Sequence, residues 1–246
     1  MKARRSVLRS LLITDPLIVL TTVLFSIVSL TLSLFDPHKK IQARFAAAWA
    51  RVLLAVSGVK VEIEGLEKIS KDGSYVFVAN HLSYMDTPVA LASIPVHFRF
   101  LAKRGLFRIP FLGWHLARAG HIQVPRGDAR AAVKTMNIAA QLMRDEGVSL
   151  IIFPEGGRSR DGSLGAFKEG AALIAIRAGA PLVPIGLKGT REVLPFGSGH
   201  VRPGVVKIRI GDPVLTKGST QQDRERLTQE VRDRVAALLD EQAIPA

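Results

Sequence analysis

An uncharged apolar run near the start of the chain restricts the possible folds more than any other feature. Residues 17–35, LIVLTTVLFSIVSLTLSLF, include no charged side chain over nineteen positions. As a helix rising about 1.5 Å per residue, this run is close in length to the hydrocarbon thickness of a bilayer. It follows the basic start MKARRSVLR but ends in LSLFDP, without the small residues of a signal-peptide cleavage site. We therefore expect a membrane-associated helix rather than a cleaved signal.

Two Asp-Pro pairs, at residues 15–16 and 36–37, divide this region into two expected helices. Aspartate at a helix cap followed by proline at the first helical position is a typical start signal. The first helix should therefore begin at the first pair. The second should run from the second pair to about Ser57, with Gly58 as its C-terminal stop.

The second expected helix combines an apolar stripe with a basic face. The stripe comprises Ile41, Phe45, Trp49, Val52 and Val56, and the basic face comprises Lys40, Arg44 and Arg51. Such a helix beside an apolar one suggests a hairpin in one leaflet, with its cations among the phosphates of an anionic membrane surface. Because Lys and Arg occur on both sides of the apolar helix, a hairpin with both ends on the cytoplasmic side satisfies the positive-inside rule better than a single span does.

We therefore expect residues 1–57 to form a monotopic two-helix membrane-anchoring motif at the cytoplasmic face of the inner membrane. Two alternatives stay open. The apolar helix could be a single-pass transmembrane span, and the second helix could be an ordinary packing face of a soluble protein.

After the second helix, short β-branched runs alternate with helical periods. The expected strands are VKVEIEG, SYVFVAN, FRFLAK, HIQVP, SLIIFP, PLVPIGL and VVKIRIG. Two intervening helical stretches end in Gly147 and Gly179, as C-terminal stops should, and residues 220–242 form a charged amphipathic helix. This alternation predicts an α/β domain over residues 58–246, with a largely parallel central sheet flanked by helices. In such sheets ligands bind outside the carboxyl ends of the strands.

The charge balance predicts an anionic partner. The sequence has 34 Lys and Arg against 21 Asp and Glu, for a net charge of +13, which suits nucleic acid, a phosphate-bearing ligand or an acidic lipid surface. With only two Trp and two Tyr, the chain lacks the aromatic residues of a single-strand binder, so we expect no nucleic acid. The absence of cysteine excludes disulfides, thiolate nucleophiles and Cys-ligated zinc. No ligand spacing indicates a metal.

The segment NHLSYMD places His81 and Asp86 five positions apart, where a strand gives way to a helix. A capping box from Ser83 to Asp86 would explain the pattern, but it would put Pro88 at the fifth helical position, where proline is costly. With Thr87 as the cap, the carboxylate is free to approach the imidazole. A carboxylate that holds one ring N–H makes a neutral imidazole a general base. Spacing alone leaves a catalytic pair and a histidine beside a cap as equal alternatives.

A second segment, FPEGGRSRDG, has the features of an anion site. Backbone N–H groups near Gly156 and Gly157 can approach an anion closely, and Arg158 offers a planar fork for phosphate oxygens. Glu155 could anchor the arginine or contact hydroxyls of the ligand, and Arg126, at the end of HIQVP, is a further candidate. The segment matches neither a Walker loop nor a nucleophile elbow, so we expect no covalent serine. A Gly-rich turn with solvated arginines is the alternative.

In this order the segments resemble the glycerophospholipid acyltransferase family, in particular its bacterial 1-acylglycerol-3-phosphate acyltransferases. The family's first block, Asn-His-x-Ser-x-x-Asp, is matched by Asn80, His81, Ser83 and Asp86, and its second by Gly120 and Arg126. The third block, Glu-Gly-Thr-Arg-Ser, appears as Glu155, Gly156, Gly157, Arg158 and Ser159, with glycine where threonine is usual, and the fourth as Val183, Pro184 and Ile185. Two further familial stretches, FLAKRGLFRIPFLGW and FKEG, carry Lys103 and Lys168.

The resemblance implies that His81, oriented by Asp86, deprotonates the sn-2 hydroxyl of lysophosphatidic acid. The hydroxyl would attack an acyl thioester, acyl-CoA or acyl-carrier protein, and give phosphatidic acid for phospholipid biosynthesis. Three cations, Arg126, Arg158 and Lys103, would hold the acceptor phosphate.

The resemblance assigns the other motif positions supporting roles. Glu155, Gly156 and Gly157 would belong to the binding site of the acceptor phosphate, where Glu155 would help to order it. The remaining motif positions are Asn80, Ser83, Ser159, Lys168, Val183 and Pro184. No metal or redox cofactor is implied. Because Gly157 departs from the family pattern, another lysophospholipid or a lyso-ornithine lipid is an alternative acceptor. A non-catalytic, membrane-tethered anion-binding protein is the alternative of another class.

Overall fold

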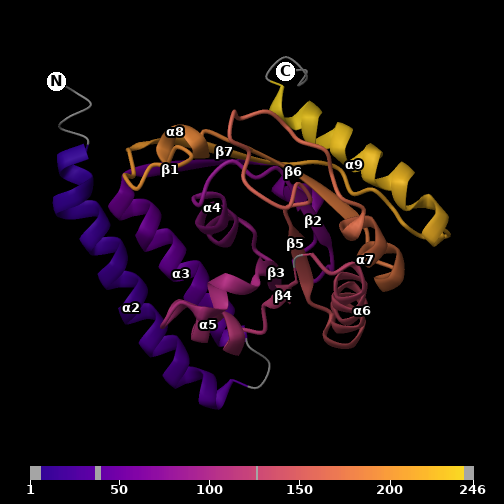
Figure 1. The fold of residues 1–246 in the computed structure, drawn as a ribbon, viewed down its shortest axis with the longest axis horizontal. Helices are drawn as coiled ribbons and strands as arrows, with labels where there is room; N and C mark the ends of the chain where they lie inside the picture. Colours follow the sequence, from indigo (N-terminus) through magenta and orange to yellow (C-terminus); the bar gives the residue numbers. More distant parts are fainter. Residues whose placement is uncertain (1–6, 37–39, 126, 241–246) are drawn as a thin grey trace.

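The computed structural model describes residues 7–36, 40–125 and 127–240 (Figure 1). Within these ranges one sheet has the strand order β1-β7-β6-β2-β5-β3-β4. The strands are β1 (Val59–Glu64), β2 (Val76–Ala79), β3 (Phe98–Lys103), β4 (Ile122–Val124), β5 (Ser149–Ile152), β6 (Leu182–Lys188) and β7 (Gly204–Ile210). Neighbouring strands pair in parallel, except that β6 and β7 are antiparallel. The predicted α/β class and the largely parallel sheet are confirmed.

Helices cover both faces of the sheet. They are α4 (Asp86–Ser93), α5 (Leu112–Arg118), α6 (Ala129–Glu146), α7 (Gly170–Ala178), α8 (Thr190–Val193) and α9 (Arg224–Leu239), after α2 (Asp15–Leu32) and α3 (Lys40–Ser57). Because side chains alternate along a strand, Phe77 and Ala79 of β2 face α3 and α4, whereas Val76 and Val78 face α6, α7 and α9. In Figure 1, α2 lies on the side of α3 that faces away from the sheet, and α5 lies beside α2.

Glycines end two of these helices as predicted. Gly147 follows α6 with φ 63°, and Gly179 follows α7 with φ 67°. Both therefore adopt the left-handed conformation that favours glycine at a helix stop.

The first helix begins earlier than the predicted start at Asp15. Helical backbone is continuous from Val7 to Phe35, through the π-helical turn η1 (Ser10–Thr14), α2 and the short η2 (Ser33–Phe35). Pro16 has no N–H for a normal helical bond, and the wider π turn before it accommodates this loss. The carboxylate of Asp15 accepts a bond from the Ser10 hydroxyl (2.9 Å) and does not cap the helix. By length and composition this helix could cross a membrane.

The second Asp-Pro pair does mark the start of a helix. One oxygen of Asp36 accepts the backbone N–H groups of Ile41 (2.6 Å) and Gln42 (3.1 Å), which satisfies donors at the start of α3. Pro37 lies outside the described residues. Gly58, with φ 70°, ends α3 as predicted.

Helix α3 packs on both of its neighbours. Towards α2, the Phe45 ring meets Phe25 edge-on, with centroids 6.3 Å apart, and the Trp49 indole N–H donates to the Thr22 hydroxyl (3.1 Å). On another side, Leu53 and Leu54 lie in the core formed with α4 and the sheet. The helix therefore packs against α2 and against the core, and its membrane-anchoring role stays a prediction. The boundary between residues 57 and 58 stays a prediction.

Candidate active site

The carboxylate of Asp86 lies directly against the imidazole of His81. Its Oδ2 is 2.6 Å from His81 Nδ1 and also accepts the backbone N–H groups of Leu82 (2.7 Å) and Ser83 (2.8 Å). Since an ionised carboxylate only accepts hydrogen bonds, the ring carries its proton on Nδ1. This tautomer leaves Nε2 as a proton acceptor.

The cap of helix α4 lies two residues before the predicted cap at Thr87. Asp86 is the first residue of the helix and Met85 occupies the cap position without a side-chain bond. Pro88 is thus the third helical residue. This position is tolerated because the first four N–H groups of a helix lack intrahelical partners. The carboxylate reaches the imidazole from the first turn, so the predicted approach does not require Asp86 to lie outside the helix.

The loop after β5 holds His81 from three sides. The backbone N–H of His81 donates to Glu155 Oε1 (2.7 Å), and its carbonyl accepts the N–H of Ser159 (2.8 Å). The Phe153 ring stacks on the imidazole, with centroids 4.2 Å apart and planes 19° apart. The imidazole is therefore positioned by contacts that need no ligand.

Both oxygens of Glu155 bind backbone donors. Oε1 accepts from His81, and Oε2 accepts from the N–H of Gly165 (3.2 Å). Burial raises the pKa of Glu155, and the two backbone bonds oppose this effect. Among the described residues Glu155 forms no ion pair with Arg158. The carboxylate thus holds two loops together around the histidine.

Arg158 lies between two aromatic rings. Its guanidinium carbon is 3.6 Å from the centroid of the Tyr84 ring and 4.7 Å from that of Phe196. Aromatic faces orient the plane of a guanidinium while its N–H edge stays available. Within the described part of the chain no carboxylate pairs with this arginine, so its donors are free for an anion.

The two glycines beside Arg158 differ in their surroundings. Gly156 has φ 74°, a left-handed backbone conformation that favours glycine, and a Cβ there would meet the flexible end of the Lys168 side chain. A Cβ on Gly157 would meet no atom within 4 Å. The space that the threonine of the family pattern would occupy is therefore open in this protein.

The strand order brings the predicted cations towards the same edge. Parallel strands β2, β5, β3 and β4 are consecutive neighbours, so the residues that follow them share one edge of the sheet. Lys103 is the exposed last residue of β3. Arg126 follows β4 but lies outside the described residues, and its role stays a prediction.

Two residues of the first motif bind the backbone instead of facing solvent. The buried amide of Asn80 exchanges two bonds with Leu187 of β6, donating to its carbonyl (2.9 Å) and accepting its N–H (2.7 Å). The Ser83 hydroxyl donates to the carbonyl of Leu194 (2.8 Å). These bonds fix the strand-to-helix turn that carries His81.

The other motif positions also have structural contacts. The Ser159 hydroxyl donates to Asp161 (3.0 Å), which stabilises the turn after Arg158. Val183 and Pro184 lie in β6 beside β2 and are buried. Among the described residues, none of these contacts is made to the imidazole, so their support is indirect.

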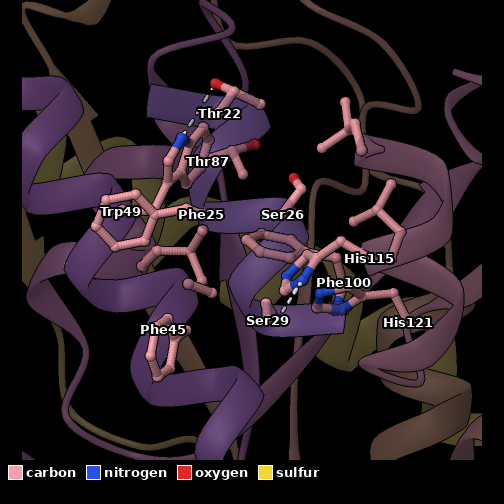
Figure 2. A pocket seen from close by; sticks show the side chains of 14 residues that line it. Thr22, Phe25, Ser26, Ser29, Phe45, Trp49, Thr87, Phe100, His115 and His121 are labelled. Atoms are coloured by element: carbon pink, nitrogen blue, oxygen red, sulfur yellow. Dashed lines mark hydrogen bonds between the residues drawn. The ribbon is translucent and has the colours of Figure 1, made fainter. Parts of the chain in front are cut away.

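An apolar cavity of about 80 Å³ is lined in part by Thr87, the residue that follows Asp86 in the sequence (Figure 2). It lies between α2, α3 and α5, and its lining includes Thr87, Phe25, Trp49, His115 and His121. A 2.9 Å contact joins His115 Nδ1 to the Ser29 hydroxyl across the cavity wall.

One of the histidines that line this cavity, His121, is neutral. His121 Nδ1 accepts the backbone N–H of Phe100 (3.0 Å), and burial lowers the pKa of His121 to about 3. The cavity therefore presents no full charge from this residue. No cluster of three His, Asp or Glu side chains suited to a metal ion occurs among residues 7–36, 40–125 and 127–240.

Several contacts around the site could not be predicted from the motifs. Phe153 and Tyr84 lie inside the two quoted segments, but neither carries a titratable group at neutral pH and neither was singled out. Phe196 and Gly165 lie far from both segments in the sequence. Their contacts depend on the fold, and no local pattern indicates them.

Comparison with known proteins places this geometry in a family. A family model described as Acyltransferase matches residues 60–188, which include both motif segments and β1 to β6. The chain belongs to the acyltransferase family. The predicted resemblance is thereby confirmed at the level of the family.

Relatives of the acyltransferase family cover most of the chain. It is 37% identical over 210 residues to the 1-acyl-sn-glycerol-3-phosphate acyltransferase LPAT1, chloroplastic, of Arabidopsis thaliana, covering 84% of this chain and 57% of that protein. It is 31% identical over 202 residues to the 1-acyl-sn-glycerol-3-phosphate acyltransferase of Borreliella burgdorferi, covering 78% and 77%. The chain thus spans less than two thirds of the length of the chloroplast relatives.

One solved structure from the acyltransferase family resembles the whole fold. It is the crystal structure of the 1-acyl-sn-glycerophosphate (LPA) acyltransferase, PlsC, from Thermotoga maritima, with a TM-score of 0.81 and 27% identity. The match covers 100% of both chains and therefore includes the N-terminal helices as well as the sheet.

Proposed function

We propose that the protein transfers an acyl chain from an acyl thioester to the sn-2 hydroxyl of 1-acylglycerol-3-phosphate, forming phosphatidic acid for phospholipid biosynthesis. The observation that carries the proposal is the His81–Asp86 contact of 2.6 Å at the carboxyl edge of the sheet, close to an Arg158 that pairs with no carboxylate among the described residues. The names of the relatives support the choice of acceptor. The acyl donor is acyl-CoA or acyl-carrier protein.

The chemistry needs one base that later acts as an acid. Nε2 of His81 takes the proton of the acceptor hydroxyl as its oxygen attacks the thioester carbonyl. Asp86 stabilises the imidazolium that forms. When the tetrahedral intermediate collapses, the C–S bond breaks and the imidazolium returns the proton to the departing thiolate. The products are the ester and a free thiol, and the proposed cycle requires neither a metal nor a redox cofactor.

Arg158 is the principal ligand of the acceptor phosphate in this proposal. Its guanidinium is oriented by Tyr84 and Phe196 and can offer two parallel N–H donors. Lys103 adds positive charge at the same edge, and Arg126 is proposed as a further contact of the phosphate. Because Glu155 already binds two backbone donors, we assign it the task of positioning His81 rather than contacting the acceptor.

In this proposal the N-terminal helices hold the site at a membrane. Leu20, Leu24 and Ile27 are exposed on α2, and their burial among lipid tails would keep the protein at the bilayer surface. The acceptor then needs no transfer of its tail into water. The apolar cavity beside Thr87 can receive the end of an acyl chain. We propose monotopic attachment at the cytoplasmic face, where soluble thioesters are available.

A direct assay tests the proposal. Purified protein in neutral detergent, supplied with lysophosphatidic acid and either acyl-CoA or acyl-carrier protein, should form phosphatidic acid only when a donor is present. Parallel reactions with lysophosphatidylethanolamine and a lyso-ornithine lipid measure acceptor preference. If another lysolipid is acylated and lysophosphatidic acid is not, the proposed acceptor is wrong and the proposed acyl-transfer mechanism still holds.

The Glu155→Gln variant should lower kcat by roughly tenfold or more and leave the KM for the acceptor nearly unchanged. A glutamine can accept only one of the two backbone N–H groups, and its own NH₂ would face the other, which costs about 1–3 kcal/mol. The change displaces His81 but removes no contact to the acceptor. Initial rates at several acceptor concentrations separate the two constants. A raised KM with normal kcat would instead assign Glu155 to the acceptor.

Three glutamates on α2 should release the protein from membranes. The variant Leu20→Glu/Leu24→Glu/Ile27→Glu loses three lipid-facing side chains, each worth about 1.5–3 kcal/mol of apolar burial. Most of the protein should then remain in the supernatant after membranes are sedimented in high salt. Deletion of residues 1–57 is a poorer test, because Leu53 and Leu54 belong to the core and their loss would unfold the protein.

The matched control places glutamates at exposed apolar positions elsewhere. Val133→Glu/Ile138→Glu/Leu215→Glu adds the same charge and should sediment like the wild type. Because the chain has no cysteine, Lys2→Cys and Ala246→Cys variants report topology. Monotopic attachment predicts that both are labelled from the cytoplasmic side. Labelling of the two ends from opposite sides would establish a transmembrane span.

A further inference from the structure

A second and larger cavity, of about 450 Å³, lies along α3. Facing α3 are Ile94 and Val96, from the segment that joins α4 to β3, and Phe98 of β3. Phe98 is the first residue of β3, so this groove lies towards the amino ends of the parallel strands. His81 follows the carboxyl end of β2. The groove is therefore distinct from the proposed active site.

The groove has an apolar floor. Its apolar lining comprises Ala43, Ala46, Ala47, Leu91, Ile94, Pro95, Val96, Phe98 and Ala119. Ala46, Leu91 and His121 also line the smaller cavity, so the two spaces are adjacent. A ligand that uses this floor must carry an apolar part.

Three cations border the same groove. Arg44 and Arg51 lie on α3, two turns and about 10 Å apart, and Lys71 follows the short helical turn η3 (Leu66–Lys68). All three are exposed, and no acidic residue is in the described lining. Among the described residues no carboxylate pairs with any of them. The rim therefore attracts an anion that the described part of the protein does not supply.

A buried polar residue also lines the groove. The side chain of Gln42 is 1% exposed and lines the groove, and its Oε1 has no hydrogen-bond partner among the described residues. A buried amide oxygen without a partner is costly, and such groups are rare in native structures.

We propose that the groove binds one anionic phospholipid of the bilayer, with its phosphate near Arg44, Arg51 and Lys71 and the first part of a tail on the apolar floor. Free phosphate would leave the floor unused. A zwitterionic lipid would bring a cation to a rim that is already positive. Helix α2, which packs against α3, carries the exposed apolar face, so the proposed membrane attachment would bring lipid close to the groove.

This lipid would connect two parts of the protein. One wall of the groove belongs to the N-terminal hairpin, and the other belongs to the α/β unit. A ligand that binds only the folded form raises its stability. A lipid in the groove should therefore raise the melting temperature of the protein. The inference does not depend on acyl transfer, because neither His81 nor Arg158 takes part.

The test uses the full chain in neutral detergent with dihexanoylphosphatidylglycerol, a short-chain anionic lipid. Native mass spectrometry counts retained lipids, and a melting curve measures stabilisation. The variant Arg44→Gln/Arg51→Gln/Lys71→Gln should bind roughly 100-fold more weakly at this site and lose the rise in melting temperature. The control Arg130→Gln/Lys134→Gln/Lys217→Gln removes the same amount of charge from exposed positions outside the groove and should behave as wild type.

Two further variants separate the groove from other lipid sites. Ala47→Phe fills the groove without a charge change and should also lose the lipid. Arg158→Gln should keep the lipid, since that residue belongs to the carboxyl edge.

Equal lipid retention by the first triple variant and its control would overturn the proposal. So would equal stabilisation by dihexanoylphosphatidylcholine, or by inorganic phosphate at the same concentration. Acyl transfer measured on the same samples shows independently whether the proposed function holds.

Discussion

Replacing His81 with alanine should reduce acyl transfer by roughly 100- to 10,000-fold, the usual contribution of a positioned general base. The substitution removes the imidazole held by Asp86 and leaves the surrounding loops in place. The loops stay in place without the imidazole because Glu155 and Ser159 bind the backbone of residue 81, not its side chain. The loss should therefore appear in kcat, with little change in the melting temperature.

A second histidine provides the control for this result. His200 lies beside Asp15, with Nδ1 3.5 Å from its carboxylate, and belongs to neither motif. The variant His200→Ala should transfer acyl chains at nearly the wild-type rate. If His81→Ala retained a comparable rate while remaining folded, the general-base assignment would be wrong.

The two substitutions Asp86→Asn and Asp86→Ala should have different effects. One oxygen, Oδ2, receives the His81 ring and two backbone N–H groups, so an asparagine would turn its oxygen to this position. The productive ring tautomer is thereby kept. What is lost is the negative charge that stabilises the imidazolium, and we expect roughly a 100-fold lower kcat. This loss is smaller than the about 10,000-fold loss known when such a change also reverses the tautomer.

Alanine at the same position removes the acceptor as well as the charge. The N–H groups of Leu82 and Ser83 then lose their partner, at about 1–3 kcal/mol for each buried donor. Asp86→Ala should be as inactive as His81→Ala and also less stable in thermal unfolding. Equal activity of the asparagine variant and the wild type would show that the carboxylate only caps the turn.

Regular elements of the fold follow from local patterns in the sequence. Each predicted strand is found: the central strands β2, β5 and β6 are apolar runs buried on both faces, and the edge strand β1 alternates apolar and polar residues. Gly147 and Gly179 mark helix ends. The prolines indicated helix boundaries less reliably than the glycines did. Pro16 lies inside a continuous helix because a π turn accommodates it, and Pro88 is accepted in the first turn of α4.

Only part of the site could be predicted, because the contacts that orient its residues come from distant parts of the sequence. Sequence motifs identify residues that carry charge or can take up protons, such as His81 and Arg158. The groups that orient them are a phenylalanine stacked on the imidazole, aromatic rings beside the guanidinium and a distant backbone N–H of Gly165. These contacts form between segments that are separated in the chain, so no local spacing records them.

The double packing of α3 has a consequence for selectivity. The same helix lies against α2 through Phe45 and Trp49 and enters the core through Leu53 and Leu54. In the proposed monotopic attachment, a hairpin fixed in this way would set the height of the imidazole above the hydrocarbon boundary. Acceptor hydroxyls at a different depth, however reactive, would pass above or below Nε2. The protein would then choose among the positions of a lipid glycerol by depth in the bilayer as well as by the shape of a binding site.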